Sequence, residues 1–320
     1  MKRIDRIDGA LAVALGFSLA WSAHACAEPA PAPPAPVDAS PPDASASPED
    51  AAPDATPVFG AHLGRYSTLY AYQGPHAPRA HNIERIARLF DFAAASFIGP
   101  GDLWSFNVVV GPRTEDNGFV FAPTIFLGEV MDDVGGGTCQ VSSTIFAAAL
   151  RAGLDVIERT PHSRPSKYID KGLDATVSYP AGDAGPAGKL DLVLRNPYPF
   201  EVEMKVEIGD SGDPMRSLNV AFFGKEPGPV VDLRWKTASH EPPGAPRFHK
   251  TGKIRTATYK RRVQESAPGI LGTLLVSRTY ADGHSDERRF QSHYRPTAEV
   301  WEVGLDWDMS RNPWDPPAQP

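Results

Sequence analysis

Three residues of this chain have the chemistry and the order that a cysteine nucleophile requires. The first, Cys139, follows the glycine run Gly135 to Gly137 and opens the helical pattern that continues through IFAAALRAG. A cysteine in the first turn of a helix lies at the positive end of the helix dipole, where free N–H groups stabilise a thiolate. The sequence therefore predicts a helix that begins at Thr138 or Cys139 and a sulfur with a lowered pKa.

His162 and Asp174 have the positions needed to complete a thiol triad. His162 follows the strand-like LDVIERT, and Asp174 opens the next strand-like stretch, DATVSY. In such a triad the cysteine attacks an acyl carbon, the histidine takes and returns the proton, and the aspartate orients the imidazole. This order is similar to that of transglutaminase-like and papain-like folds. The opposite hypothesis stays open, with Cys139 a buried small hydrophobe, His162 an exposed loop residue and Asp174 a turn cap.

Polar residues near this stretch are candidates for binding a substrate. The backbone N–H of Cys139, with Gln140, is a candidate donor to an oxyanion. Asn107 and Arg113 lie in the run SFNVVVGPRT, where they are candidates to contact a carboxylate or a peptide carbonyl, Arg113 in a bidentate manner. An equally good interpretation is that Asn107 and Arg113 belong to a hydrogen-bond network around the Gly-Pro turn between them.

The charge balance and the histidine spacing exclude other kinds of site. The 320 residues carry a formal net charge of −7, which disfavours a surface for nucleic acid. No ligand pair surrounds Cys139, and His162 has no second histidine three to five residues away, so we expect no metal ion. No other cofactor is predicted either.

The N-terminal residues have the features of an export signal. Basic residues precede an apolar run from Ala10 to Trp21 that is too short to span a membrane, and a small-residue site, Ala-His-Ala, comes before Cys26. Ordinary cleavage and lipid attachment at Cys26 are both compatible with this pattern. We therefore expect an exported protein, periplasmic or on the cell surface, with no transmembrane span in the mature chain and with a lipid anchor at Cys26 as one alternative.

Composition divides the chain into five expected segments. After the signal at 1–26, residues 27–57 are almost entirely Ala, Pro, Asp and Ser, which predicts a disordered tether. Residues 58–223 mix helical and strand-like patterns, residues 224–303 are strand-like, and residues 304–320 are expected to be a flexible tail. The predicted fold class is α+β, with an antiparallel sheet packed against a few helices and a smaller all-β C-terminal part.

Hydrophobic periodicity predicts the elements around the site. An amphipathic helix is expected over residues 81–97, HNIERIARLFDFAAASF, and a short buried strand over LWSFNVVV at 103–110. Beyond the Cys139 helix, LDVIERT, DATVSY, KLDLVLRN and FEVEMKVEI predict successive strands of one antiparallel sheet.

A longer pattern carries a family resemblance. The runs SFNVVVGPRTEDNGFVFAP, GGGTCQVSSTIF, PHS, DATV and LRN occur in this order between Thr68 and Ile208, and they resemble the VanW family of bacterial envelope proteins. That family takes its name from an accessory gene in glycopeptide-resistance clusters, and its members are usually exported or membrane-anchored. The resemblance implies a cell-envelope location and a cell-wall peptide or polymer as partner, but it implies no particular reaction.

Two hypotheses of different class follow for the function. In the first, the chain is a cysteine acyltransferase or hydrolase of transglutaminase-like type that acts on peptide-like substrates such as the peptidoglycan stem peptide. In the second, it is a non-catalytic peptidoglycan-binding or scaffold module, and Cys139 only packs the core. The reactivity of Cys139 and its position relative to His162 and Asp174 distinguish the two.

Overall fold

The computed structural model describes residues 60–91, 93–126, 129–179, 190–252 and 254–310. The expected export signal, Cys26, the expected tether and residues 311–320 of the expected tail lie outside the described residues. Within the described ranges, no helix has the length and apolar character needed to cross a membrane.

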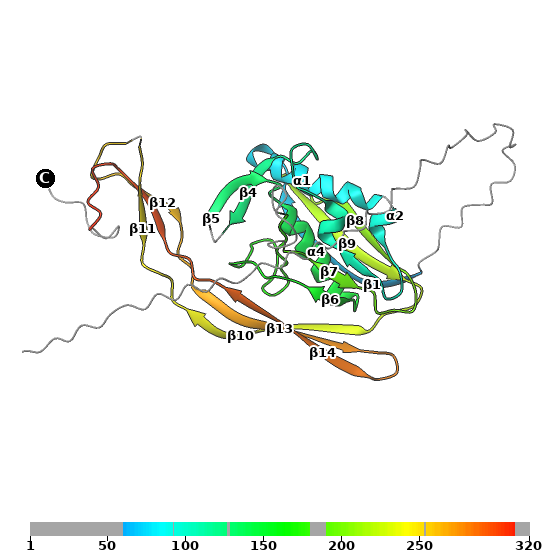
Figure 1. Cartoon of the computed structure of the whole chain (residues 1–320). Coiled ribbons are helices and arrows are strands. Elements are labelled where there is room, and N and C mark those ends of the chain that lie inside the picture. The colour runs from blue at the N-terminus through cyan, green and yellow to red at the C-terminus, as the bar shows by residue number, and fades with distance from the viewer. Residues whose placement is uncertain (1–59, 92, 127–128, 180–189, 253, 311–320) are drawn as a thin grey trace, which may run out of the picture. The chain divides into compact units, whose positions relative to one another are not determined.

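The helix that carries Cys139 is supported by an antiparallel sheet (Figure 1). The strands of this sheet are, in spatial order, β1 (Ala61–Ala71), β9 (Met215–Gly224), β8 (Val202–Asp210) and β2 (Phe97–Ile98). Helix α4 (Thr138–Arg151) packs on β1 and β9, and α1 (Ala77–Ala87) lies beside α4.

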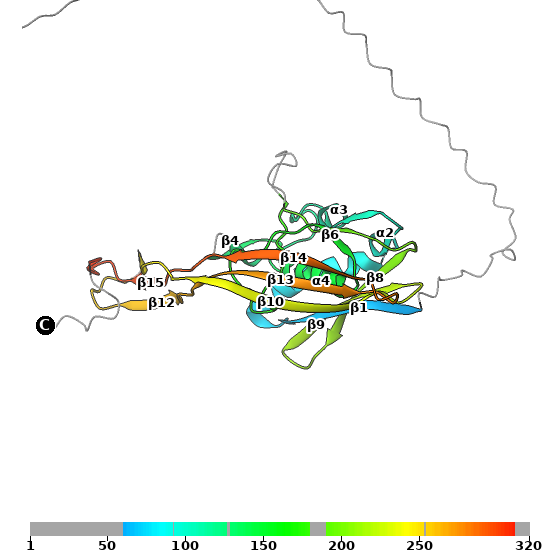
Figure 2. The ribbon, with the colours of Figure 1, turned by 90° about the horizontal axis from the view of Figure 1, so that it is seen from below.

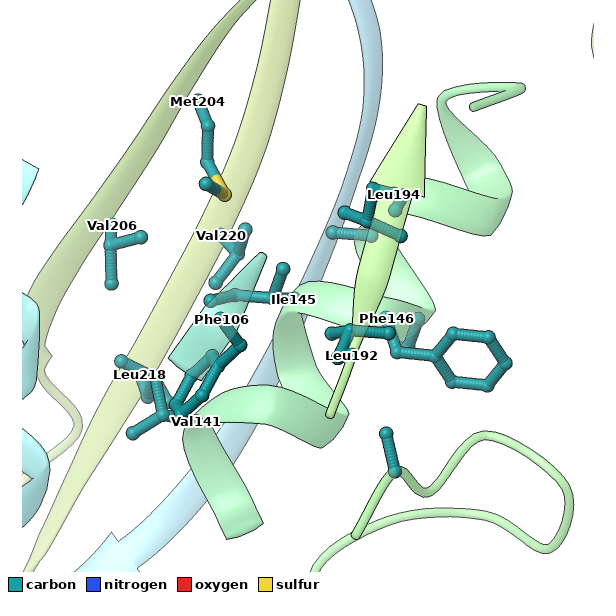
Figure 3. Close-up of a cluster of buried hydrophobic side chains, with 14 of the residues drawn as sticks. Phe106, Val141, Ile145, Phe146, Leu192, Leu194, Met204, Val206, Leu218 and Val220 are labelled. Carbon is teal, nitrogen blue, oxygen red and sulfur yellow. The ribbon is translucent and has the colours of Figure 1, made fainter. Parts of the chain in front are cut away.

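Helix α4 is buried along nearly its whole length because its side chains are small or apolar. Figure 3 shows Val141 and Ile145 on the side of the helix that meets Leu218 and Val220 of β9. Phe146 points away from that sheet, and its ring meets the Phe290 ring edge-on at 5.7 Å between centroids. Burying a side chain of this size contributes about 1.5–3 kcal/mol, so both faces of α4 anchor the Cys139 turn.

Shorter elements surround this core. A second sheet has the spatial order β3 (Leu103–Ser105), β7 (Val193–Arg195) and β6 (Asp155–Glu158). The remaining short elements are α2 (Ala93–Ser96), α3 (Phe106–Val110) and the hairpin of β4 (Phe121–Phe126) with β5 (Glu129–Val134). The hairpin ends at the glycine run that leads into α4.

The C-terminal part of the described chain is built of strands. A long antiparallel sheet has the order β10 (Val230–Glu241), β13 (Gly269–Thr279) and β14 (Ser285–Tyr294), which run side by side in Figure 2. Leu274 and Val276 of β13 belong to the same apolar core as α4. The buried Arg278 binds Asp155 of β6 at 3.2 Å and Asp286 of β14 at 2.6 Å, which ties the two sheets together.

A small separate sheet completes the fold. Its order is β11 (Arg247–Lys250), β15 (Val300–Val303) and β12 (Lys260–Gln264), with β11 and β15 parallel. Trp301, Val303 and Trp307 form its apolar cluster, and Phe248 packs against them. Trp307 is thus buried, although it belongs to the segment 304–320 that is expected to be a flexible tail.

The predicted fold class is confirmed, since helices and antiparallel sheets are combined and the C-terminal part is made of strands. The prediction that the strands after α4 form a single antiparallel sheet is wrong. LDVIERT and KLDLVLRN contribute β6 and β7 to the sheet of β3, whereas FEVEMKVEI forms β8 in the sheet of β1. DATVSY makes one isolated bridge, between Thr160 and Thr176, because its polar groups are used at the site described below.

Two local predictions also differ from the structure. The helix expected over residues 81–97 begins at Ala77, just before Pro78, whose fixed φ suits a first turn, and it changes to a 3₁₀ turn at Arg88–Asp91. The strand expected at 103–110 ends at Ser105. The Ser105 hydroxyl accepts a hydrogen bond from the Val108 N–H at 3.1 Å, which caps the start of α3.

Candidate active site

Cys139 lies in the first turn of α4, as the sequence predicts. The helix begins at Thr138, directly after Gly137, whose φ of 103° lies in the left-handed region. Cys139 is partly exposed as a residue, and its Sγ donates a hydrogen bond to the carbonyl of Val177 at 3.6 Å. Cys139 is therefore a partly exposed residue that packs against the edge of the core.

His162 and Asp174 form a buried pair next to this turn. A carboxylate can only accept, so the imidazole Nδ1 donates to Asp174 Oδ2, at 2.9 Å, and the His162 backbone N–H donates to the same oxygen at 2.6 Å. Only 7% of His162 and 1% of Asp174 is exposed, so His162 is not the exposed loop residue of the alternative interpretation. The two hydrogen bonds fix the backbone at His162 and the orientation of its imidazole ring.

Asp174 is also held from its other side. Arg159 Nη2 lies 3.2 Å from Asp174 Oδ1, and Arg159 Nε donates to the Asp174 backbone carbonyl at 2.6 Å. The Tyr294 hydroxyl donates to Oδ1 as well. Burial raises the pKa of Asp174, but the hydrogen bond from His162 and the charges of His162 and Arg159 lower that pKa to about 2. The carboxylate is therefore ionised at neutral pH.

The His162 imidazole acts on the Cys139 thiol as well as on Asp174. Burial raises the pKa of Cys139, but the interaction with the His162 side chain and its charge outweigh burial and lower the pKa. Burial lowers the pKa of His162, whereas Tyr168, Asp174 and Cys139 together raise it well above its ordinary value. Both shifts favour a thiolate beside an imidazolium, which is the state of an activated cysteine nucleophile.

Tyr168 lies next to the Nε2 side of the His162 imidazole. Its hydroxyl lies 3.5 Å from His162 Nε2, and the two rings meet edge-on at 6.4 Å between centroids. Burial raises the pKa of Tyr168, so its hydroxyl is protonated at neutral pH and is available as a donor. The imidazole thus contacts Asp174 on one side and Tyr168 on the other.

The other predicted site residues have defined partners. The Gln140 side chain is buried, donates to Thr68 Oγ1 at 2.9 Å and accepts from Arg79 Nη2 at 2.6 Å. Asn107 is buried too, and its Nδ2 donates to the carbonyls of Ser178 and Leu190 at 3.1 and 2.9 Å. Both side chains therefore brace the segments around Cys139.

Arg113 has a mixed role. Its Nη1 donates to the Gly111 carbonyl at 2.9 Å, which agrees with the turn-stabilising interpretation. Its Nη2 is buried and has no hydrogen-bond partner among the described residues, and its charge lowers the pKa of Cys139. Arg113 thus lies near the sulfur with one donor unused.

Four residues that contribute to this site are not singled out by the sequence pattern. Arg159 and Tyr168 lie within a few positions of His162, and this closeness is the signal that could have indicated them. Arg79 and Tyr294 lie far from the triad in sequence and offer no such signal. Within the part of the chain that the structure describes, no group of three or more His, Cys, Asp or Glu is arranged to hold a metal ion.

Comparison with known proteins relates the segment that carries this site to a family. Residues 78–215 match the family model described as VanW like protein. The chain carries a VanW-like domain. This confirms the resemblance found in the sequence, and Cys139, His162 and Asp174 all lie within the VanW-like segment, whereas Tyr294 lies outside it.

Two curated proteins are similar to the chain that carries this VanW-like domain. The uncharacterized protein YoaR of Bacillus subtilis is 43% identical over 121 residues, which is 38% of this chain and 38% of YoaR. The vancomycin B-type resistance protein VanW of Enterococcus faecalis is 28% identical over 135 residues, 41% of this chain and 45% of that protein. The similarity to each relative therefore covers less than half of its length.

Proposed function

We propose that this protein is an exported cysteine acyltransferase or hydrolase of the cell envelope, with Cys139 as nucleophile. The observation that carries this proposal is the buried His162–Asp174 pair, in which the imidazole Nδ1 donates to Asp174 Oδ2 at 2.9 Å, beside a Cys139 thiol whose pKa His162 lowers. A buried histidine that is oriented by a carboxylate is the arrangement of a catalytic triad, whereas a cysteine that only packs the core does not require it.

The reaction would proceed in two halves. The Cys139 thiolate attacks the acyl carbon of an amide, the C–N bond breaks, and the imidazolium of His162 protonates the departing amine. The resulting thioester is then attacked by water or by a second amine. His162 takes the proton of that nucleophile, and the thiolate is released with a carboxylic acid or a new amide as product.

A developing oxyanion would be stabilised at the start of α4. The first N–H groups of a helix have no intrahelical partner, and they lie at the positive end of its dipole. The N–H of Gln140 donates to the Gly137 carbonyl at 3.0 Å, so we assign this role to the N–H of Cys139. The Tyr168 hydroxyl, next to His162 Nε2, is a second donor on this side of the sulfur.

The proposed substrate is peptide-like and belongs to the cell wall, with the peptidoglycan stem peptide as the leading candidate. Support comes from the signal-like N-terminal sequence and from the relative whose name refers to vancomycin B-type resistance. A location in the periplasm or on the cell surface, with lipid attachment at Cys26 as one alternative, belongs to the same proposal.

The test is the reactivity of the Cys139 thiol in the folded full chain. Iodoacetamide labelling would be followed by digestion and mass spectrometry, so that Cys139 is quantified separately from Cys26. We expect Cys139 to be alkylated at pH values below the ordinary pKa range of a cysteine. His162→Gln should shift the midpoint of this pH profile upward. Incubation with peptidoglycan fragments should leave a covalent adduct on Cys139, and the adduct should be absent in Cys139→Ser.

The alternative is a non-catalytic peptidoglycan-binding or scaffold module. In that case Cys139 would stay unreactive until the protein unfolds, and Cys139→Ser would change stability without changing any wall-modifying activity. Such a result would remove the enzymatic proposal while leaving the binding hypothesis.

A further inference from the structure

Two arginines converge on the turn that precedes Cys139. Arg79 comes from α1, and Arg113 comes from the loop after α3. Neither makes a salt bridge with a carboxylate among the described residues. Arg79 Nη2 donates to Gln140 Oε1 at 2.6 Å, Arg113 Nη1 donates to the Gly111 carbonyl at 2.9 Å, and Arg113 Nη2 is buried without a partner there.

The glycine run lets both arginine segments lie directly against the turn. A Cβ at Gly135 would meet the Cβ of Arg113 at 2.9 Å. A Cβ at Gly137 would meet the Arg79 carbonyl at 3.0 Å and its Cγ at 3.1 Å. Both glycines also have positive φ, of 89° and 103°, so a side chain is disfavoured there on two counts. Arg113 therefore packs against Gly135, and Arg79 packs against Gly137.

Aromatic rings support both guanidinium groups. Arg79 lies over the Tyr168 ring at 5.6 Å, and Arg113 lies over the rings of Phe106 and Tyr179 at 5.3 and 5.6 Å. Stacking of this kind fixes the plane of a guanidinium and leaves the N–H groups at its edge free to bind a planar anion.

The described residues around Cys139 carry an excess of positive charge. Asp174 is paired with Arg159, and the Cys139 thiolate is paired with the His162 imidazolium. Burial lowers the pKa of Arg79 and lowers that of Arg113 to about 10, so both remain protonated at neutral pH. Asp191 acts on Arg113 by its charge, but among the described residues neither guanidinium forms a salt bridge with a carboxylate, so this partly buried positive charge beside the nucleophile favours a bound anion.

We propose that Arg79 and Arg113 bind a carboxylate of the substrate, so that the acyl donor is a peptide with a free carboxylate close to the bond that breaks. This deepens the acyl-transfer proposal and rests on it for the chemical step. In the simplest case Cys139 attacks the last peptide carbonyl of the chain. The C–N bond breaks, the C-terminal amino acid leaves with a proton from His162 on its nitrogen, and its carboxylate stays on the arginines until release.

A pair of alkylating reagents tests this without knowledge of the natural substrate. Iodoacetate and iodoacetamide react with the same sulfur, but only iodoacetate carries a carboxylate. The rates would be measured at Cys139 in the full chain, and their ratio would be divided by the ratio for glutathione in the same buffer. We expect a normalised ratio of about ten or more, because charge-assisted bidentate hydrogen bonds are among the strongest in proteins.

Matched variants locate the effect. Arg113→Gln and Arg79→Gln should each bring the normalised ratio toward one, and Arg113→Lys should give an intermediate value because it keeps the charge and loses the planar fork. Arg88→Gln is the control, since Arg88 follows α1 and its side chain is 68% exposed, and it should leave the ratio unchanged. A ratio equal to that of glutathione would overturn the carboxylate inference, although rapid iodoacetamide labelling would still support the acyl-transfer proposal.

A binding measurement distinguishes failure of the carboxylate inference from failure of the acyl-transfer proposal. If neither reagent labels folded Cys139, the acyl-transfer proposal fails, and the carboxylate inference is decided with Cys139→Ala by calorimetry. N-acetyl-dialanine with a free carboxylate should bind more tightly than its C-terminal amide, and Arg113→Gln should abolish the difference. Equal binding of acid and amide, or binding of inorganic phosphate in preference to the acid, would overturn the assignment of a carboxylate.

Discussion

The hydroxyl of Tyr294 donates a hydrogen bond to Oδ1 of Asp174, across a sequence separation of 120 residues. The same hydroxyl accepts a hydrogen bond from the Gly172 N–H at 2.7 Å, so Tyr294 holds the loop as well as the carboxylate. Tyr294 ends β14, outside the VanW-like segment 78–215. The C-terminal sheet therefore contributes directly to the position of the proposed orienting residue.

Tyr294→Phe should weaken both stability and the reactivity of Cys139. The change removes a hydrogen bond to a buried carboxylate and leaves the Gly172 N–H unpaired, so we expect a loss of about 2 kcal/mol in the free energy of unfolding. The iodoacetamide rate of Cys139 should fall because His162 is oriented less firmly. Urea unfolding and labelling kinetics measure the two effects. Tyr280→Phe is the control, and an equal response of the two variants would contradict a specific role for Tyr294.

The stability of the protein should decrease at acidic pH through Asp174. The pKa of Asp174 is about 2 in the folded protein against its ordinary value of 3.8, so its contribution to stability is complete above about pH 4 and is lost as the pH falls toward 2. A shift of this size corresponds to roughly 2 kcal/mol. Urea midpoints measured across this window should fall more steeply for the wild type than for Asp174→Asn. Asp232→Asn, at a side chain that is 61% exposed, should keep the wild-type slope.

Gly137→Ala should be more damaging than an alanine at another glycine of positive φ. Gly101 has a φ of 78° and open space around it, so Gly101→Ala costs only the backbone strain, about 1–2 kcal/mol. Gly137→Ala adds the close contact with the Arg79 carbonyl, and its loss of stability should be larger. The iodoacetate to iodoacetamide ratio should also fall in Gly137→Ala alone. Similar stability and unchanged ratios in both variants would contradict the close packing of Arg79 against Gly137.

Ser143→Ala should loosen the link between α4 and the Asp174 loop. The Ser143 hydroxyl donates to the Cys139 carbonyl at 2.6 Å and accepts from the Ala175 N–H at 3.0 Å. Its removal leaves that N–H unpaired in a buried place, so we expect a loss of about 1–3 kcal/mol and slower labelling of Cys139. Ser142→Ala loses only hydroxyl donation to carbonyls, and its thermal unfolding should change less. The reverse order would contradict this account.

The sequence alone determined the features that depend on neighbouring residues. Glycines followed by a helical pattern predicted that α4 begins at Thr138 or Cys139, because a turn with positive φ and a first helical turn are coded locally. Alternating and helical periodicities were enough for the α+β class. The order of Cys139, His162 and Asp174 in the chain was also sufficient to suggest that the three belong together, and in the structure His162 is hydrogen-bonded to Asp174 and lowers the pKa of Cys139.

Only the tertiary structure decided which distant segments complete the site. DATVSY reads as a strand, yet its backbone and the Asp174 carboxylate bind Ser143, Arg159 and Tyr294 in place of a sheet partner. Arg79 and Arg113 meet at the glycine turn because α1 and the loop after α3 both pack against it. Such contacts join residues that are far apart in sequence, and they form because the core packs in one arrangement that no local pattern specifies.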